Sequence, residues 1–169
     1  MLLEIHSLLV RLVFVKPQKP YTITSLHYPR ATNPMHSNNP NALVSAQWLH
    51  DHINDANLKI IDASWYLPNM QPDAYDEYSK SHIPGAQFFD IDQVCDQTSN
   101  LPHMAPSIET FTAYLSAMGI SAADQVVVYD GAGLFSAARV WWLFKLMGLN
   151  GVAVLNGGLP KWKSRGHAT

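Results

Sequence analysis

The sequence predicts an α/β fold, a doubly wound central parallel sheet with helices on both faces. Short apolar runs rich in β-branched or aromatic residues recur along the chain from Val44 onward. Segments with apolar residues at helical spacing separate these runs, as the crossover between two parallel strands requires. Strands that alternate with helices in this way build a parallel sheet that is covered on both faces. The 169 residues are enough for one such domain with its own core.

Four elements are expected in the first part of this domain: a helix at 46–53, a strand at 58–63, a short helix at 73–80 and a strand at 86–91. Ser45 is suited to cap the first helix, because its hydroxyl can accept a hydrogen bond from a backbone N–H of the first turn. His82 is expected to end the second helix, and Pro84-Gly85 to turn the chain into the next strand. Proline fixes one backbone dihedral, and glycine readily takes the positive φ that many such turns require.

Five more elements are expected after residue 106: a helix at 108–118, a strand at 125–130, a helix after "GAGLF", a strand at 151–155 and a last short helix within 157–169. Ser107 is suited to cap the first of these helices, and Gly119 to close it. The apolar faces consist of Ile108, Phe111, Leu115 and Met118 in that helix, and of Val140, Leu143, Phe144 and Met147 in the next.

Composition and charge exclude several kinds of partner. The hydrophobic content of 47% and the charged content of 14% are typical of a soluble globular protein. No apolar run reaches the roughly 18 to 20 residues that a membrane-spanning helix needs, so no membrane partner is expected. Residues 44–169 hold more acidic than basic side chains. This part of the chain therefore lacks the basic footprint of a nucleic-acid-binding protein.

The single cysteine, Cys95, excludes both an intrachain disulfide framework and a zinc site made of several thiolates. A reducing compartment fits this composition, and a cytoplasmic location is expected. No metal or cofactor is expected.

Residues 1–42 differ from the rest of the chain, because an apolar stretch interrupted by Arg11 is followed by a segment rich in Pro, Asn and Ser. This segment lacks the basic start and the cleavage site of a secretory signal. It is expected to be a disordered leader, an organelle presequence or a spurious extension upstream of a start near Met35. A real presequence would favour a mitochondrial location. The domain itself is expected to span 43–169.

In proteins with an open parallel sheet, the functional residues lie at the carboxyl ends of the strands. This rule selects Asp62 to Tyr66, Asp90 to His103, and Asp130 to Ser136. The last of these loops is not a phosphate-binding loop, because no Gly-Lys-Ser/Thr follows, and "GAG" lacks the third glycine of a dinucleotide fingerprint. A cysteine phosphatase would need a cysteine five residues before an arginine, and the loop has none. By its own chemistry this loop has no nucleophile.

Several segments together resemble the rhodanese-like sulfurtransferases. "YSKSHIPGAQFF" is similar to their amino-proximal signature, and further matching segments occur in the order and spacing of the amino-terminal half of the two-domain enzymes. These are "LVSAQWL", "IIDASWYLP", "FFDID", "VVVYD", "SAARVWW" and "LNGGLPKW". The resemblance covers residues 43–165 and implies a rhodanese-like fold. "TSNLPHM", with His103, is more similar to 3-mercaptopyruvate sulfurtransferases than to thiosulfate-preferring rhodaneses.

The resemblance implies that the nucleophile lies elsewhere. In such enzymes the carboxy-terminal repeat carries a cysteine in the loop after its fourth strand, and this chain has Asp130 at the corresponding position. The chain thus resembles the non-nucleophilic half of a truncated two-domain enzyme, and alone it is expected to be inactive. The implied partners are a second rhodanese domain in cis, a small sulfur donor, and cyanide or a thiol acceptor such as a thioredoxin-like protein. The implied chemistry is attack of a cysteine thiolate on the donor sulfur, which gives a persulfide.

The same resemblance implies supporting catalytic roles for Asp92 and His103. A carboxylate can fix the histidine tautomer, and the imidazole can relay protons near neutral pH. Simpler interpretations stay open at this point: Asp92 as a loop cap and His103 as a solvated loop residue. Cys95 lies away from the expected nucleophile position. The alternative functions are a thiosulfate sulfurtransferase half and a non-catalytic interaction module.

Simpler roles are also expected for the aromatic residues near these loops. Trp65 and Tyr66 are expected to cover the sheet edge. Arg139, Trp141 and Trp142 are expected to pack a helix on the sheet and on a partner domain. For Arg139, Trp141 and Trp142 this packing role is favoured over ligand binding.

Overall fold

The structure is a computed structural model that describes residues 42–70 and 73–169. The leader expected at residues 1–42 falls almost entirely outside these ranges. The described elements are β1 (Leu43–Val44), α2 (Ala46–His52), β2 (Leu58–Asp62), α3 (Ala74–Lys80), β3 (Ala86–Phe88), α4 (Ile108–Ala117), β4 (Gln125–Tyr129), α5 (Ala137–Leu146), β5 (Val152–Leu155) and α6 (Gly158–Ser164).

The strands form one sheet in the order β1-β5-β4-β2-β3, and every neighbouring pair is parallel. The predicted α/β class and the parallel sheet are therefore confirmed. β4 lies at the centre and is buried along its whole length. β2 pairs with β4 from Leu58 opposite Gln125 to Asp62 opposite Tyr129. This register brings Asp62 and Asp130 to the same edge of the sheet, where the strands end.

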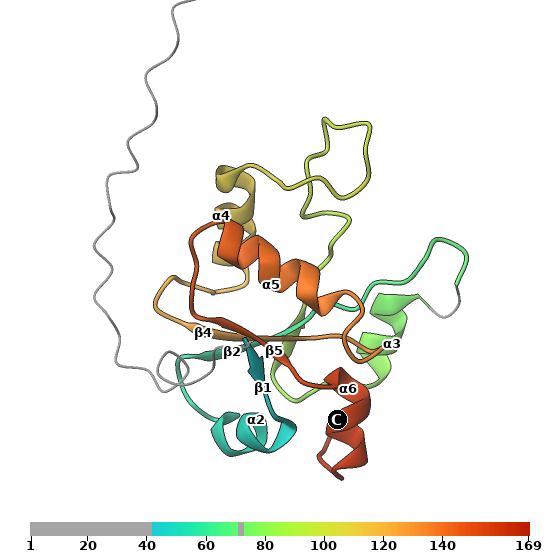
Figure 1. Cartoon of the computed structure of the whole chain (residues 1–169), viewed down its shortest axis with the longest axis vertical. Helices are drawn as coiled ribbons and strands as arrows, with labels where there is room; N and C mark the ends of the chain where they lie inside the picture. Colours follow the sequence, from blue (N-terminus) through green and yellow to red (C-terminus); the bar gives the residue numbers. More distant parts are fainter. Residues whose placement is uncertain (1–41, 71–72) are drawn as a thin grey trace, which may run out of the picture. The chain divides into compact units, whose positions relative to one another are not determined.

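Helices cover both faces of this sheet, α4 and α5 on one side and α2 and α6 on the other (Figure 1). The alternation of side chains along the strands sends successive residues into different cores. In β4, Val126 and Val128 pack in the cluster under α4 and α5, whereas Val127 and Tyr129 pack in the cluster with α2 and α6. Both faces are apolar, which explains the unbroken hydrophobic run of this strand.

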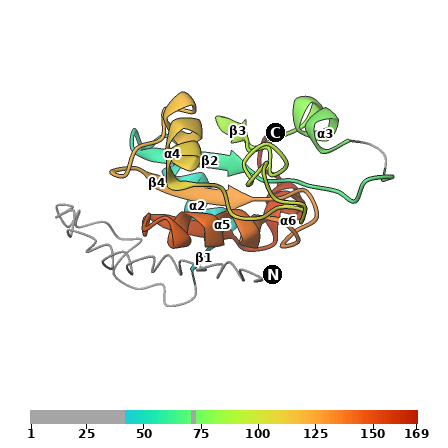
Figure 2. The same cartoon turned by 90° about the horizontal axis from the view of Figure 1, so that it is seen from above.

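The helix α3 lies beside β3 at the edge of the sheet (Figure 2). The Tyr78 hydroxyl donates a hydrogen bond of 2.8 Å to the carbonyl of Ala86, which ties the helix to the strand. The imidazole of His82 stacks on Tyr78, with 4.4 Å between the ring centroids, and its Nδ1 lies 2.7 Å from the Tyr78 carbonyl oxygen. Gly85 has the positive φ expected of the turn, 79°. His82 therefore has a structural role beside this turn.

The observed elements differ from the expected ones in several details. The helix α3 ends at Lys80, as its expected range 73–80 requires, but His82 lies two residues beyond and does not end it, because Ser81 is already extended. The strand β3 ends at Phe88, since the Asp90 carboxylate caps a turn that leads the chain away. Ile108 is 56% exposed and does not belong to the buried face of α4. It is the first residue of the helix, directly after the Ser107 cap.

Candidate functional site

The two aspartates of "FFDID" have different roles. The Asp90 carboxylate accepts hydrogen bonds from the backbone N–H groups of Asp92 (2.9 Å) and Gln93 (3.1 Å). Such a bond pattern caps a turn and leaves the next carboxylate free. Asp92 projects its side chain outwards with a relative exposure of 62%. The loop-cap interpretation therefore applies to Asp90, and Asp92 is available for another contact.

Asp92 binds His103. The imidazole Nε2 lies 2.6 Å from Oδ1 of Asp92, and the histidine side chain is 27% exposed. A carboxylate can only accept a hydrogen bond, so Nε2 must carry the proton. The neutral ring then has its lone pair on Nδ1. The structure thus brings together the two residues selected from the sequence and defines which ring nitrogen can act as a base.

The backbone around His103 is held in an uncommon conformation. Its φ is 56°, in the left-handed region that residues other than glycine seldom adopt. The surrounding loop is closed by a hydrogen bond of 2.9 Å from the N–H of Asp96 to the carbonyl of Met104. Hydrogen bonds from Thr98 to the side chain of Asp96 lower the pKa of that carboxyl and secure the turn. These contacts direct the imidazole back towards Asp92.

Trp65 is the residue whose part in this site the sequence did not predict. Its indole N–H donates to both oxygens of the Asp92 carboxylate, at 3.2 and 3.1 Å. Its ring also meets the imidazole of His103 edge to face, with 5.0 Å between centroids. Trp65 was expected only to cover the sheet edge. The signal that could have found it was its position in one of the three selected loops, together with the need of a tryptophan N–H for a partner.

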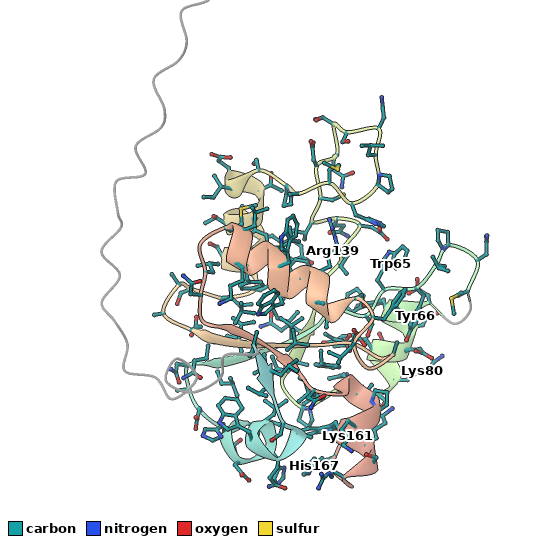
Figure 3. The ribbon with its side chains drawn as sticks, in the orientation of Figure 1. Trp65, Tyr66, Lys80, Arg139, Lys161 and His167 are labelled. Atoms are coloured by element: carbon teal, nitrogen blue, oxygen red, sulfur yellow. The ribbon has the colours of Figure 1, made fainter. Side chains whose placement is uncertain are left out.

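Trp65 and Tyr66 lie next to each other at the side of the sheet from which α5 starts (Figure 3). The Tyr66 hydroxyl donates a hydrogen bond to the Glu77 carboxylate of α3. Burial raises the pKa of Tyr66 above its ordinary value, and the Glu77 carboxylate adds a smaller effect in the same direction. A Cβ atom at Gly131 would lie 2.8 Å from the Tyr66 hydroxyl, so a side chain at this position would displace the phenol ring. Tyr66 thus joins α3 to the loop after β4.

The Asp130 carboxylate fills the loop after β4. Its Oδ1 accepts from the N–H groups of Ala132, Gly133 and Leu134 at 2.6–3.1 Å, and its Oδ2 from those of Phe135, Ser136 and Ala137 at 2.7–2.9 Å. The loop curls around a single carboxylate and includes Leu134 at a φ of 112°. Asp130 is 1% exposed. The position therefore holds a buried anion and offers no nucleophile.

A second buried carboxylate, Asp62, lies beside this loop. Ser64 donates to it from both its backbone N–H and its hydroxyl, and the same hydroxyl accepts a hydrogen bond of 2.8 Å from the N–H of Gly131. Burial raises the pKa of Asp62 above its ordinary value, and the bonds from Ser64 act in the opposite direction. The network ties the end of β2 to the loop after β4.

Cys95 lies on the rim of the site. Its thiol donates to the carbonyl of Asp92 at 3.1 Å, and the Gln97 amide donates to its sulfur at 3.1 Å. The guanidinium of Arg139, on α5, has Nε and Nη2 buried without a hydrogen-bond partner among the described residues. Burial lowers the pKa of Arg139, and Cys95 acts in the opposite direction. The thiol makes no contact with the imidazole of His103 among the hydrogen bonds of the described residues.

Within residues 42–70 and 73–169, no three His, Cys, Asp or Glu side chains gather closely enough to hold a metal ion. No helix of this part of the chain is long and apolar enough to cross a membrane. The chemistry that the described site can perform is proton transfer at Nδ1 of His103 and hydrogen bonding by Trp65 and Asp92.

Comparison with known proteins identifies relatives over most of the described chain. Residues 45–165 match the Rhodanese-like domain family. Thiosulfate/3-mercaptopyruvate sulfurtransferase 2 of Arabidopsis thaliana is 52% identical over 134 residues, which are 79% of this chain and 39% of that protein. The 3-mercaptopyruvate sulfurtransferase of Homo sapiens is 48% identical over 127 residues, which are 72% of this chain and 43% of that protein.

Solved structures agree with this assignment. SseA from Escherichia coli, described as a 3-mercaptopyruvate sulfotransferase with the "Rhodanese" fold, superimposes with a TM-score of 0.71 at 41% identity. The match covers 75% of this chain and 48% of that chain. The chain spans about two fifths of the length of the curated relatives that it matches.

Proposed function

Because the chain belongs to the rhodanese-like domain family, we propose that it is the amino-terminal domain of a sulfurtransferase that moves sulfane sulfur from 3-mercaptopyruvate to a thiol or to cyanide. The close relatives are sulfurtransferases, and they are more than twice as long as the matched segment. The observation that carries the proposal is the hydrogen bond of 2.6 Å between Asp92 and His103, next to a loop whose nucleophile position holds Asp130. An acid–base pair without a nucleophile fits a domain that serves a cysteine on a second rhodanese domain.

His103 moves one proton in the proposed reaction. Its Nδ1 accepts the proton of the cysteine thiol on the second domain, while Asp92 stabilises the imidazolium through Nε2. The thiolate attacks the sulfur of 3-mercaptopyruvate, the carbon–sulfur bond breaks, and its electron pair stays on the carbon as the enolate of pyruvate. The imidazolium returns the proton to this carbon. The cysteine is left as a persulfide, and an acceptor such as a thioredoxin-like protein then takes the outer sulfur.

The 169-residue chain alone is expected to have no sulfurtransferase turnover. The test measures pyruvate release from 3-mercaptopyruvate and thiocyanate formation from thiosulfate and cyanide with the purified chain. Robust turnover that Cys95→Ser abolishes would overturn the proposal, because the nucleophile would then lie in this domain.

The complementary test exchanges domains. The matched segment of the Arabidopsis sulfurtransferase 2 is replaced by residues 42–169 of this chain, which gives a domain-exchanged enzyme that contains the rest of the relative. Turnover with 3-mercaptopyruvate is expected in this enzyme, and His103→Ala should lower it. Equal turnover of the His103→Ala variant and of the unsubstituted domain-exchanged enzyme would remove the proton-relay role.

The sulfur donor can be tested with the same domain-exchanged enzyme. A thiosulfate sulfurtransferase of Cricetulus griseus is 46% identical over 132 residues, so thiosulfate is the second candidate. A ratio of kcat/KM for thiosulfate to kcat/KM for 3-mercaptopyruvate that exceeds the ratio of the unexchanged Arabidopsis enzyme would favour thiosulfate, because the two enzymes differ only in this domain. A non-catalytic interaction module is the remaining alternative, and it requires that the domain-exchanged enzyme be inactive although folded. The cytoplasm is the proposed compartment, and the mitochondrion, named for one Arabidopsis relative, is the alternative.

A further inference from the structure

Trp65 contacts both members of the Asp92–His103 pair. Its indole Nε1 lies 3.2 Å from Oδ1 and 3.1 Å from Oδ2 of Asp92, so a single N–H faces both carboxylate oxygens. A donor in this position fixes the plane of the carboxylate, because a rotation of the carboxyl group moves at least one oxygen away from the N–H. The indole also meets the imidazole edge to face at 80°, a favourable arrangement for two aromatic rings.

Asp92 needs such support, because its side chain is 62% exposed. Within the described residues its carboxylate accepts hydrogen bonds from the side chains of Trp65 and His103 only. An exposed polar contact of this kind gains little when water competes for it and when both side chains lose rotamer freedom. Without Trp65 the carboxylate would have one protein partner and could turn into solvent.

Trp65 is itself held by the loop that lacks a nucleophile. Its ring stacks against Phe135, with 6.4 Å between centroids and 19° between planes. Phe135 is 58% exposed, but its backbone N–H donates to the buried Asp130 carboxylate at 2.7 Å. A continuous set of contacts therefore runs from Asp130 through Phe135 and Trp65 to the acid–base pair.

We propose that Trp65 is a positioning residue that acts through Asp92: its N–H fixes the carboxylate so that His103 keeps its Nε2 proton on Asp92 and presents Nδ1 to the reacting thiol. This inference deepens the proposed function and rests on it. Phe135 supports the indole from the loop after β4. The loop that holds Asp130 in place of a nucleophile thereby contributes to the site through packing.

The kinetic test uses Trp65→Phe in the domain-exchanged enzyme. The substitution keeps an aromatic ring and removes the N–H. We expect kcat to fall about tenfold, the factor that corresponds to about 1.4 kcal/mol of lost transition-state stabilisation, with little change in KM. In a background that carries Asp92→Asn, the same substitution should lower kcat less than about twofold, because a residue that acts through Asp92 has no further effect once the carboxylate is gone.

The matched control is Trp48→Phe. Trp48 also stacks on a histidine, His52, but it lies on α2, across the sheet from α4 and α5. It should leave kcat and KM unchanged. If Trp65→Phe lowers kcat by the same factor with and without the Asp92→Asn substitution, or if Trp48→Phe has an equal effect, Trp65 has only a structural role and the inference is wrong.

A spectroscopic test on the 169-residue chain separates this inference from the proposed function. The indole N–H proton signal of Trp65 should shift when His103 is replaced by glutamine, and Asp92→Asn should abolish that response. The Trp48 signal should not depend on Asp92. A Trp65 signal that is unchanged by substitutions at both His103 and Asp92 would overturn the inference without any assay of activity. If Asp92→Asn leaves turnover unchanged while this coupling is present, the proposed function fails and the positioning contact stands.

Discussion

Asp130→Asn should destabilise the fold by about 3–4 kcal/mol, a loss that follows from the hydrogen bonds of its carboxylate. This group accepts six backbone N–H groups, three at each oxygen. An amide side chain has nearly the same shape but replaces one oxygen by an NH₂ group, so three N–H groups would face a donor. A buried donor left without an acceptor costs about 1–3 kcal/mol. Three of them at the low end of this range, as fits a loop that water can partly reach, give the stated loss.

The assay is urea unfolding followed by tryptophan fluorescence and circular dichroism. The loss is a large part of the roughly 5–15 kcal/mol that stabilises a typical domain, so the unfolding midpoint should fall well below that of the wild type. Asp124→Asn is the matched control. The Asp124 carboxylate also accepts hydrogen bonds, from the N–H and hydroxyl of Ser121, but these are exposed. The Asp124→Asn variant should lose less than about 1 kcal/mol of unfolding free energy. Equal losses for both variants would refute the role of Asp130 in holding the loop.

Three further predictions concern the fold. Gly158→Ala should lower the free energy of unfolding by about 2–4 kcal/mol, because the new Cβ would overlap the Asp130 carbonyl oxygen at a φ of 53°. Gly148→Ala, where a Cβ would meet open space, should lower it by about 1 kcal/mol, and equal losses in urea unfolding would contradict this reasoning. The pKa of Asp62 is higher in the folded state than its unfolded value of 3.8. The stability that the protonated Asp62 contributes is therefore complete below pH 3.8 and is lost as the pH rises through the folded-state pKa. Asp62→Asn should therefore gain stability relative to the wild type as pH rises from about 4 to 7, and a pH-independent difference in unfolding free energy would refute the burial argument. Cys95→Ser should change the unfolding free energy by less than about 1 kcal/mol, and a larger loss would show that the rim thiol is structural.

Most of the layered fold could be predicted because most elements carry a local signal. Ser45, Asp73 and Ser107 all occupy N-cap positions, and their side chains accept from N–H groups of the first turns. The apolar run of β4 marks a strand buried on both faces. The strand β1 was missed, because two residues show no alternation and are held by pairing with β5, which is distant in sequence.

The site could be predicted only in part. The family resemblance selected Asp92 and His103, and the structure joins these residues, which lie 11 positions apart in the chain. The bond of Trp65 to Asp92 spans 27 residues and depends on where two loops meet, which no local pattern encodes. The resemblance placed Asp130 at the nucleophile position, but the six N–H groups around it follow from a loop conformation that has no signature in the sequence.

The most direct test of the proposed sulfur transfer is a single turnover of the domain-exchanged enzyme with 3-mercaptopyruvate, quenched at short times and analysed by mass spectrometry. We expect one added sulfur on a cysteine outside residues 42–169 and none on Cys95. We also expect His103→Ala to slow the appearance of this sulfur about 100-fold or more, the usual contribution of a general acid–base group. Sulfur on Cys95, or an unchanged rate in the His103→Ala enzyme, would contradict the proposed division of labour between the two domains.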